Sequence, residues 1–353
     1  MNPISLKITI KDIAEKSGVS PGTVDRVLHN RGNVSESSRK KVEEVLKHIN
    51  YTPNLFASAL ASKKTFSLLA IVPQYKPDDY WEKIELGIRK AAREIADFHV
   101  LIEIIYFHQY KVESFCQIME QVVKKHPDGV LLAPSLKSVT YDFTCILDSE
   151  KIPYVFIDSF VEEAHALAYY GQNSHQSGYL GAKLLFSQKI DLQEIAIFNF
   201  SYIGQTSNQI SLRMAGFSKY ISEKRTNCKL HRAILHADDP AQNEKTMNDL
   251  FFNNKGIDGA IIFSSRAYVV ADFLKKHHLN HITFIGYDLL NKNVTRLKDN
   301  TISYLIAQRP EEQGYKGIKA LSDHLVFKKK INRVNYTSID ILTQENIDFY
   351  SEF

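Results

Sequence analysis

Short apolar runs alternate with amphipathic stretches from residue 66 onward, and this alternation strongly limits the possible folds. The residues between the first runs, around 81–97, 111–125 and 140–149, have helical periodicity. The apolar runs have the length of buried strands: FSLLAIVP, VLIEIIYF, GVLLAP and PYVFID and, after YYGQNS, EIAIFNF, KLHRAIL, GAIIF and ITFIGYD. The pattern predicts an α/β fold with parallel sheets that occurs twice.

Two parallel sheets in one chain predict a ligand cleft between two lobes, because ligands bind beyond the carboxyl ends of parallel strands. The sequence contains no GxxxxGK[ST] loop, no GxSxG elbow and no GxGxxG after the first strand. Three histidines in KKHHLNHI, His277, His278 and His281, have no acidic residue or cysteine near them in the sequence and indicate a solvated basic helix end rather than a metal site. We therefore expect a binding protein, not an enzyme, without metal or cofactor.

The composition is that of an ordinary globular chain of 353 residues, 44% hydrophobic and 24% charged. No apolar run approaches the ~20 residues needed to span a bilayer, and the start MNPISLKITI lacks the features of a secretory signal. We therefore expect a cytoplasmic protein. The odd number and wide spacing of Cys116, Cys145 and Cys228 predict buried or partly buried thiols rather than a disulfide framework.

The net charge of +4 is unevenly distributed along the chain. Residues 1–64 hold eleven Lys or Arg and six Asp or Glu, a net charge of +5, so the remainder carries −1. This asymmetry is typical of a small module that binds a polyanion, attached to a nearly neutral body.

The basic N-terminal segment predicts three short helices. A first helix ends at Gly18, and Ser20 and Pro21 are suited to the N-cap and first helical position of a second. Ser35 is a candidate N-cap for the third helix. The apolar positions that recur at helical spacing are Ile10, Ile13, Ala14, Val24, Val27, Leu28, Val42, Val45, Leu46 and Ile49. Two helices joined by a tight glycine-containing turn form a helix-turn-helix, whose second helix enters the major groove of DNA.

The alternative is a generic three-helix bundle with basic residues facing solvent. Two details favour DNA binding. The second helix starts with the small residues Pro21, Gly22 and Thr23, which permit close approach to a groove, and its first N–H groups suit a phosphate. Arg26 follows one turn later and can pair with guanine or phosphate, and His29 and Arg31 extend the basic edge.

The segment also follows the pattern KDIA-x-x-x-GVS-x-x-TV-x-RVL, then VS-x-x-x-R-x-x-V and Y-x-PN. This resembles the headpiece of the LacI/GalR family of bacterial transcriptional regulators. Two positions depart from that family: Asp25 replaces a usual Ser, and the two principal base-reading positions hold Pro21 and Gly22, which cannot hydrogen-bond a base. Arg26 must then carry more of the readout. The resemblance implies DNA contacts by Thr9, Ser20, Pro21, Gly22, Thr23, Arg26, His29, Asn30, Arg31, Asn54, Ala57 and Leu60.

Residues 53–65 follow the headpiece and hold a short amphipathic stretch with Phe56, Ala59 and Leu60. It is too short to be a stable isolated helix. The family resemblance implies a hinge helix that orders with its dimer mate in the minor groove, where Leu60 is a wedge between base steps. The alternative is an ordinary flexible linker.

The body, residues 66–353, resembles the effector domain of the same family, which has the fold of periplasmic sugar-binding proteins. Ser159 replaces the Arg that commonly follows the position of Asp158 in that family, and Ser264, Ser265 and Arg266 replace a usual Asn-Asp pair. The resemblance implies effector contacts by Tyr75, Tyr80, Trp81, Asp158, Arg213, Asp288 and Gln308. Such a set suits a neutral or anionic polyol, because carboxylates accept hydrogen bonds from hydroxyls and Arg donates two.

Together these features predict a helix-turn-helix headpiece (1–52), a hinge (53–65) and an effector domain of two lobes. The lobes are expected at 66–170 plus 307–330, and at 171–306 plus the C-terminal end. We expect a homodimeric transcriptional repressor that binds a near-palindromic operator and responds to a sugar-like effector. The principal alternative is a solute-binding protein without a regulatory DNA role; a sugar-processing enzyme is a third, less favoured hypothesis.

Overall fold

The computed structural model describes residues 9–28, 32–49, 56, 59–60, 62, 64–109, 111–200, 207–225 and 227–351. The chain forms two compact units, Met1–Lys63 and Lys64–Phe353. Within the described residues, no helix has both the length and the apolar character needed to cross a membrane.

The smaller unit contains the three predicted helices, α1 (Ile10–Ser17), α2 (Pro21–Leu28) and α3 (Glu36–His48). Their apolar faces meet in one small core of Ile13, Ala14, Val24, Val27 and Val42. The predicted periodicity is therefore confirmed, since each helix contributes residues from its apolar stripe.

Polar caps and one glycine set the boundaries of these helices. The Thr9 N–H donates to Asp12 Oδ2 (2.7 Å), and the Asp12 N–H donates to Thr9 Oγ1 (3.4 Å), which forms a capping box. Gly18 ends α1 with a left-handed φ of 66°. The Thr23 N–H donates to Ser20 Oγ (3.2 Å), and Ser35 caps α3 through the Ser38 N–H (3.3 Å). The caps predicted at Ser20 and Ser35 are therefore present.

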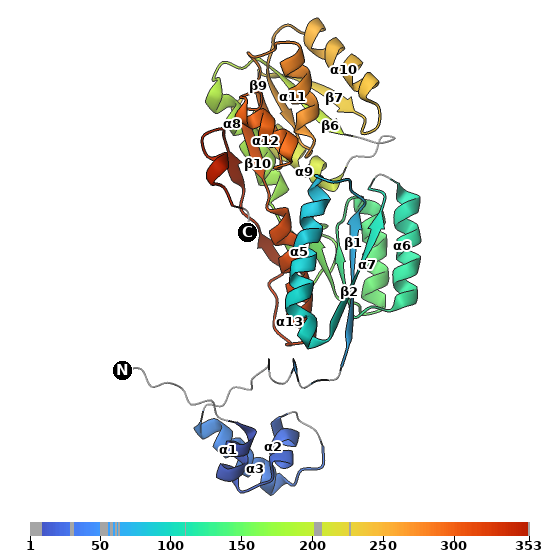
Figure 1. Cartoon of the computed structure of the whole chain (residues 1–353), viewed down its shortest axis with the longest axis vertical. Coiled ribbons are helices and arrows are strands. Elements are labelled where there is room, and N and C mark those ends of the chain that lie inside the picture. Colours follow the sequence, from blue (N-terminus) through green and yellow to red (C-terminus); the bar gives the residue numbers. More distant parts are fainter. Residues whose placement is uncertain are drawn as a thin grey trace, which may run out of the picture. The chain divides into compact units, whose positions relative to one another are not determined.

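The first lobe of the larger unit is a parallel sheet with the order β11-β5-β4-β3-β1-β2. Helices α5 and α13 cover one face, and α6 and α7 cover the other (Figure 1). Its elements are β1 (Phe66–Pro73), α5 (Tyr80–Ile95), the 3-10 turn η1 (Ala96–Phe98), β2 (Val100–Phe107), α6 (Val112–Lys125), β3 (Gly129–Leu132), α7 (Lys137–Ser149), β4 (Tyr154–Ile157), β5 (Ala168–Gly171), α13 (Pro310–Leu325) and β11 (Val334–Tyr336).

The second lobe has the equivalent order β12-β10-β9-β8-β6-β7, parallel except for β12. Helices α8 and α9 pack on one face, and α10, α11 and α12 pack on the other. Its elements are α8 (Ser174–Gln188), β6 (Glu194–Phe200), α9 (Asn208–Lys224), β7 (Lys229–Leu235), α10 (Pro240–Asn253), β8 (Ile257–Ile262), α11 (Ala267–Lys276), β9 (Thr283–Tyr287), α12 (Asn291–Lys298), β10 (Tyr304–Ala307), β12 (Asp340–Leu342) and the 3-10 turn η2 (Ile347–Phe349).

The repeated parallel architecture predicted from the sequence is confirmed, including the eight apolar strands. The chain passes between the lobes at residues 171–174, 307–310 and 336–340. The first lobe takes up β11 after α13, so its sheet includes residues beyond 330.

Two glycines allow α8 and α9 to pack in very close contact. A Cβ on Gly178 would lie 1.9 Å from the Arg213 carbonyl oxygen, and a Cβ on Gly216 would lie 1.8 Å from the His175 carbonyl oxygen. No side chain larger than hydrogen fits at these distances. The glycines therefore fix the position of α9, which carries residues of the candidate site.

The cysteines differ in part from the prediction. Cys116 and Cys228 are partly buried, as predicted, and all three are free thiols. Cys145 is exposed, so the prediction of a buried or partly buried thiol is wrong there. The reason is its place on the outer side of α7, since Phe143 and Leu147 occupy the buried side of the same helix.

The two-unit division leads to a stability prediction for Val24, which is fully buried in the small core. Val24→Ala should destabilise the smaller unit by roughly 2 kcal/mol through lost burial and a cavity. The unfolding transition of the larger unit, followed by circular dichroism during urea titration of the full chain, should keep its midpoint. A shift of that second midpoint would contradict the independence of the two units.

Candidate functional site

A cavity of about 500 Å³ lies between the two lobes of the larger unit. Each lining segment follows the carboxyl end of a strand, as expected for parallel sheets. The first lobe contributes residues 74–81, His108, Gln109 and Asp158; the second contributes Ser207, Gln209, Ile210, Ala237, Asp238, residues 263–266, Tyr268, Asp288, Leu290 and Lys292; and Gln308 lies at a crossing between the lobes.

Two buried carboxylates face this cavity from different lobes. Asp158 follows β4 in the first lobe, and Asp288 follows β9 in the second. Both have a left-handed φ of 68°, a conformation that Asp tolerates better than most residues. The same backbone turn at two equivalent strand ends thus directs two acids to one cavity.

Two glutamine side chains connect the carboxylates. Gln209 Nε2 donates to Asp158 Oδ1 (2.8 Å) and to Gln308 Oε1 (2.9 Å). Gln308 Nε2 in turn donates to Asp288 Oδ1 (2.8 Å). The chain Asp158–Gln209–Gln308–Asp288 therefore satisfies one oxygen of each carboxylate and links the lobes across the cavity.

Burial controls the protonation of this site. Desolvation raises the pKa of Asp158 to about 6, although Arg213, Tyr80 and Gln209 act in the opposite direction. Desolvation also raises the pKa of Asp288 to about 6, against the lowering effects of Arg213 and Gln308. Burial and the two neighbouring carboxylates raise the pKa of Tyr80 well above its ordinary value. Burial therefore disfavours the charged form of both carboxylates.

Arg213 supplies a positive charge close to Asp158 and Asp288. The residue is 1% exposed; its Nη1 donates to the Phe263 carbonyl oxygen (2.8 Å), and its Cζ lies 3.9 Å from the centre of the Tyr287 ring. Among the described residues, its Nε and Nη2 have no hydrogen-bond acceptor. Arg213 is not itself among the cavity-lining residues, but it contacts Phe263, which is one of them.

Aromatic side chains form part of the first-lobe wall. Tyr80 and Trp81 are buried at the start of α5 and contact each other edge to face at 5.1 Å. Tyr75 lines the cavity and donates its hydroxyl proton to Glu85 Oε2 (2.8 Å), which fixes the ring. Such faces suit the apolar side of a sugar ring.

Six of the seven residues predicted to contact an effector line one cavity, and Arg213 contacts Phe263 of its lining. Sequence reasoning missed Gln209, although a signal was present: Gln209 lies four residues before Arg213 on α9, hence on the same helix face. Ser264, Ser265 and Arg266, which the family pattern could not place, also line the cavity.

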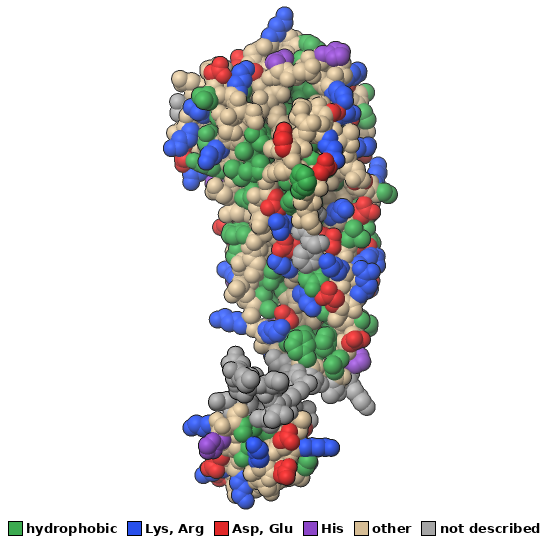
Figure 2. Space-filling view, turned by 60° about the vertical axis from the view of Figure 1, so that its left-hand side comes forward, with side chains coloured by type: hydrophobic (Ala, Val, Ile, Leu, Met, Phe, Trp, Pro, Cys, Tyr) green, Lys and Arg blue, Asp and Glu red, His purple; other side chains and the backbone are tan. Residues whose placement is uncertain are grey.

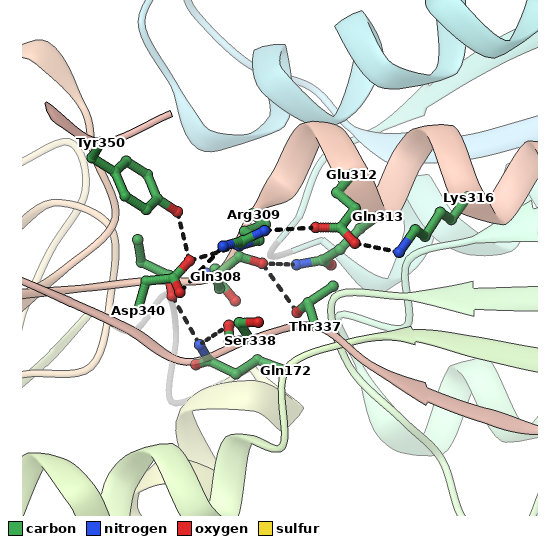
Figure 3. A network of polar contacts seen from close by, with 11 residues as sticks. Gln172, Gln308, Arg309, Glu312, Gln313, Lys316, Thr337, Ser338, Asp340 and Tyr350 are labelled. Atoms are coloured by element: carbon green, nitrogen blue, oxygen red, sulfur yellow. Dashed lines mark hydrogen bonds and ion pairs between the residues drawn. The ribbon is translucent and has the colours of Figure 1, made fainter. Parts of the chain in front are cut away.

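A polar network surrounds the crossings between the lobes (Figure 3). Gln313 Nε2 and Thr337 Oγ1 donate to the Gln308 carbonyl oxygen (2.7 and 3.2 Å). Arg309, which has a left-handed φ of 55°, donates from Nε to Asp340 Oδ2 (2.7 Å). The contacts that hold Gln308 in the cavity are thus continuous with those that hold the crossings.

The surface of the larger unit contrasts with its cavity. On the face shown in Figure 2, Lys and Arg side chains are interspersed with Asp and Glu side chains over both lobes. This face has no broad patch of a single sign, so its described residues give no reason to expect a polyanion there.

In the smaller unit, the front of α2 is open to solvent. Pro21, Gly22 and Arg26 are exposed, and an added Cβ on Gly22 would meet Ser20 Oγ at no less than 3.8 Å. Asp25 is partly buried beside them. Thr9, Ser20 and Thr23 contribute the capping contacts described above, and Leu60 is 52% exposed. The remaining residues predicted to contact DNA, His29, Asn30, Arg31, Asn54 and Ala57, lie outside the described residues.

At the end of α11, His277 lies beside an acidic side chain of α10. His277 Nε2 lies 3.1 Å from Glu244 Oε1, and its ring packs on Phe273 at 4.3 Å. The part of the chain that the structure describes contains no group of three or more potential metal-ligating side chains.

The fold and the interlobe cavity define a protein of the periplasmic-binding-protein class joined to a helix-turn-helix unit. Residues 69–329 match the periplasmic binding protein domain, and residues 9–54 match the bacterial regulatory proteins of the lacI family. A crystal structure of a protein assigned as a LacI transcriptional regulator from Bacteroides fragilis is 38% identical, with a TM-score of 0.78, over 82% of this chain and 100% of that chain. The chain belongs to the LacI family of bacterial regulatory proteins, and is accordingly not an enzyme.

Other relatives are more distant. The HTH-type transcriptional regulator DegA of Bacillus subtilis is 32% identical over 155 residues, which is 43% of this chain and 44% of that protein. The chain thus aligns with less than half the length of this curated relative. A glucose-galactose binding protein from Geobacillus stearothermophilus is 21% identical with a TM-score of 0.72, covers 81% of this chain and 99% of that chain, and shares the fold.

The buried carboxylates lead to a prediction about stability. Because the folded-state pKa of Asp288 is about 6 and exceeds its unfolded value, its charge costs stability as pH rises through 6. Asp288→Asn keeps an acceptor for Gln308 and removes the charge. The variant should therefore raise the free energy of unfolding at pH 7.5 by roughly 2–3 kcal/mol, and by much less at pH 4.

The measurement is urea unfolding of the larger unit at both pH values, and Asp299 provides a control of opposite sign. Burial raises the pKa of Asp299, but hydrogen bonds from Lys275, Thr301 and Arg296 together lower it by more. The pKa of Asp299 therefore lies below its ordinary value. Asp299→Asn should hence destabilise the fold at pH 7.5. Equal effects of the two substitutions on the free energy of unfolding would contradict the conclusion that the charge of Asp288 destabilises the fold.

Proposed function

We propose that this LacI-family protein is a sequence-specific DNA-binding repressor that acts in the cytoplasm. Two copies bind a near-palindromic operator through α2 of each headpiece, and residues 53–65 act as the hinge. The observation that carries the proposal is the open front of α2, with Pro21, Gly22 and Arg26 exposed within an N-terminal segment, residues 1–64, of net charge +5. A solute-binding protein would not require such a unit.

We infer that the effector is a neutral sugar. Two carboxylates face the cavity, and the Arg213 guanidinium lies close to them, so these three groups carry a net charge of −1 when both carboxylates are ionised. Asp158 and Asp288 can accept hydrogen bonds from hydroxyls in addition to those from Gln209 and Gln308. A uronate or a sugar phosphate would add a negative charge beside two desolvated carboxylates, at an electrostatic cost.

The effector acts by its different affinities for two arrangements of the lobes. The Gln209–Gln308 contact exists in the arrangement described here. A sugar that bonds the same carboxylates while the lobes are closed would strengthen that arrangement, and the crossings at 307–310 and 336–340 transmit the change. This mechanism makes operator affinity depend on cavity occupancy.

The DNA-binding proposal is tested through Arg26. Duplexes that bind the full chain are first selected from a random pool. Arg26→Ala should then weaken binding to the selected duplex by about tenfold or more and relax the preference at one base position. Fluorescence anisotropy at several salt concentrations measures both the affinity and its salt dependence.

Lys47→Ala is the matched control, since Lys47 is an exposed cation at the end of α3. It should change affinity for all duplexes equally, with the base preference intact. If Arg26→Ala and Lys47→Ala behave alike, Arg26 does not read bases. If no duplex is enriched by the full chain, the regulator proposal fails.

The effector proposal is tested by a thermal-shift screen of the full chain with neutral pentoses and hexoses, uronic acids and sugar phosphates. A neutral sugar should raise the melting temperature, and isothermal titration should then show at least tenfold weaker binding to Asp158→Asn. The new side chain keeps an oxygen that accepts a hydrogen bond from Gln209, and Asn, like Asp, tolerates the left-handed backbone conformation at this position. A larger shift with a uronic acid or a sugar phosphate would contradict the charge argument.

A further inference from the structure

Helix α12 begins without a polar N-cap of its own. Its N-cap residue is Leu290, whose side chain cannot accept a hydrogen bond, and its first turn contains no acidic residue. The first N–H groups of any α-helix lack partners within the helix, and Ser, Thr, Asp or Asn usually supplies one. Helix α12 therefore needs an acceptor from elsewhere in the fold.

That acceptor comes from the other lobe. The Asn291 N–H donates to Oδ1 of Asp78, which lies in the loop between β1 and α5, at 3.1 Å. The carboxylate also places a negative charge at the positive end of the α12 dipole. Asp78 thus accepts from the first amide of α12 from the other lobe, whereas an N-cap side chain normally accepts from the second or third amide of its own helix.

The loop holds Asp78 in a fixed and unusual conformation. Asp78 has a left-handed φ of 66°, and its own N–H donates to Glu82 Oε2 (2.8 Å) on the first turn of α5. The neighbouring Lys76 N–H donates to Asp79 Oδ2 (3.3 Å). These contacts orient the loop, so the position of Asp78 does not depend on α12 alone.

The contact lies at the border of the interlobe cavity. Asp78 and Leu290 are both lining residues, and neither belongs to the segments in which the chain crosses between the lobes. A second hydrogen-bonded contact between the lobes involves the Asn208 side chain on α9. Its Nδ2 donates to Ser159 Oγ (2.8 Å) and to the Phe160 carbonyl oxygen (3.0 Å). Separation of the lobes would break both contacts.

We propose that Asp78 is a closure latch that caps α12 only when the two lobes are together. Opening leaves the Asn291 N–H without its acceptor and removes a favourable charge from the helix start. The closed arrangement is then favoured by a factor of about five to ten, the typical effect of a helix N-cap. A ligand that binds between the closed lobes gains up to the same factor in affinity, and the full factor applies where the free chain is mainly open. Only this last consequence rests on the proposed function.

The latch is tested without any ligand, in the full chain, by hydrogen exchange. The Asn291 amide should exchange about five to ten times faster in Asp78→Ala than in the wild type, with a smaller increase in Asp78→Asn, which keeps an uncharged acceptor. Asp79→Asn removes a charge from the same loop but keeps an oxygen acceptor for the Lys76 N–H, so it should leave the Asn291 rate unchanged. Equal rates in the wild type and Asp78→Ala would overturn the proposal, as would an equally large effect of Asp79→Asn.

Lobe separation is measured by the distance between two spin labels. One label is placed on Cys145, which is exposed on α7, and one on an Ile190→Cys substitution after α8, with Cys116 and Cys228 replaced by Ser. Asp78→Ala should add a longer-distance population that Asp79→Asn does not add. An unchanged distance distribution would overturn the proposal even if exchange at Asn291 increased, because Asp78 would then be a cap and not a latch.

These readouts separate the latch from the proposed function. A chain that passes both tests but binds no sugar retains the latch and refutes the effector proposal. Conversely, equal exchange at Asn291 in the wild type and in Asp78→Ala overturns the latch, and a sugar that still binds leaves the effector proposal in place. Urea unfolding of each variant identifies any that fails to fold, and Asp78→Asn then serves in place of Asp78→Ala.

Discussion

Two desolvated carboxylates, one on each lobe, set the central constraint on the structure of the larger unit. A buried charge without hydrogen bonds is costly, so Asp158 and Asp288 must each find a donor. The donors are two glutamines that also bond each other. An amide has one donating and one accepting end, so once Gln308 donates to Asp288, its oxygen is directed at Gln209. The polar satisfaction of the cavity and the relative position of the lobes therefore depend on the same hydrogen bonds.

The crossings between the lobes depend on this chain as well. The side chain of Gln308 lines the cavity, and its backbone lies in a crossing. There its carbonyl oxygen accepts hydrogen bonds from Gln313 and Thr337. Gln172 Nε2 donates to the Ala307 carbonyl oxygen one residue earlier (2.9 Å). A change in the cavity at Gln308 thus reaches two other crossings within one or two hydrogen bonds. A lobe movement that keeps these hydrogen bonds would have to come from backbone rotation within the three short crossing segments.

Much of this arrangement could be predicted because burial leaves a direct record in the sequence. Strands buried on both faces are continuous apolar runs. The family resemblance predicted Asp158, Asp288 and Gln308, and each of them directly follows a strand. The strands β5, β10, β11 and β12 were not predicted, because three or four residues such as VNY and DIL carry no periodic signal. Gln209 was missed because a helix face, not a strand end, presents it. The partnership of Asp78 with α12 spans 213 residues of sequence, and no local pattern encodes it.

The two units also differ in how they can discriminate between ligands. In the cavity nearly every inner polar group has a fixed hydrogen-bond direction, so a sugar with one hydroxyl misplaced leaves a buried acceptor or donor unpaired. In the proposed DNA complex, Pro21 and Gly22 at the front of α2 offer no side-chain hydrogen bond, so selectivity at any base pair next to them must come from apolar contact, backbone approach and DNA shape. Such contacts tolerate related sequences more readily than directional hydrogen bonds do. Under the proposed function, the chain should therefore be stricter toward its effector than toward the base pairs next to Pro21 and Gly22.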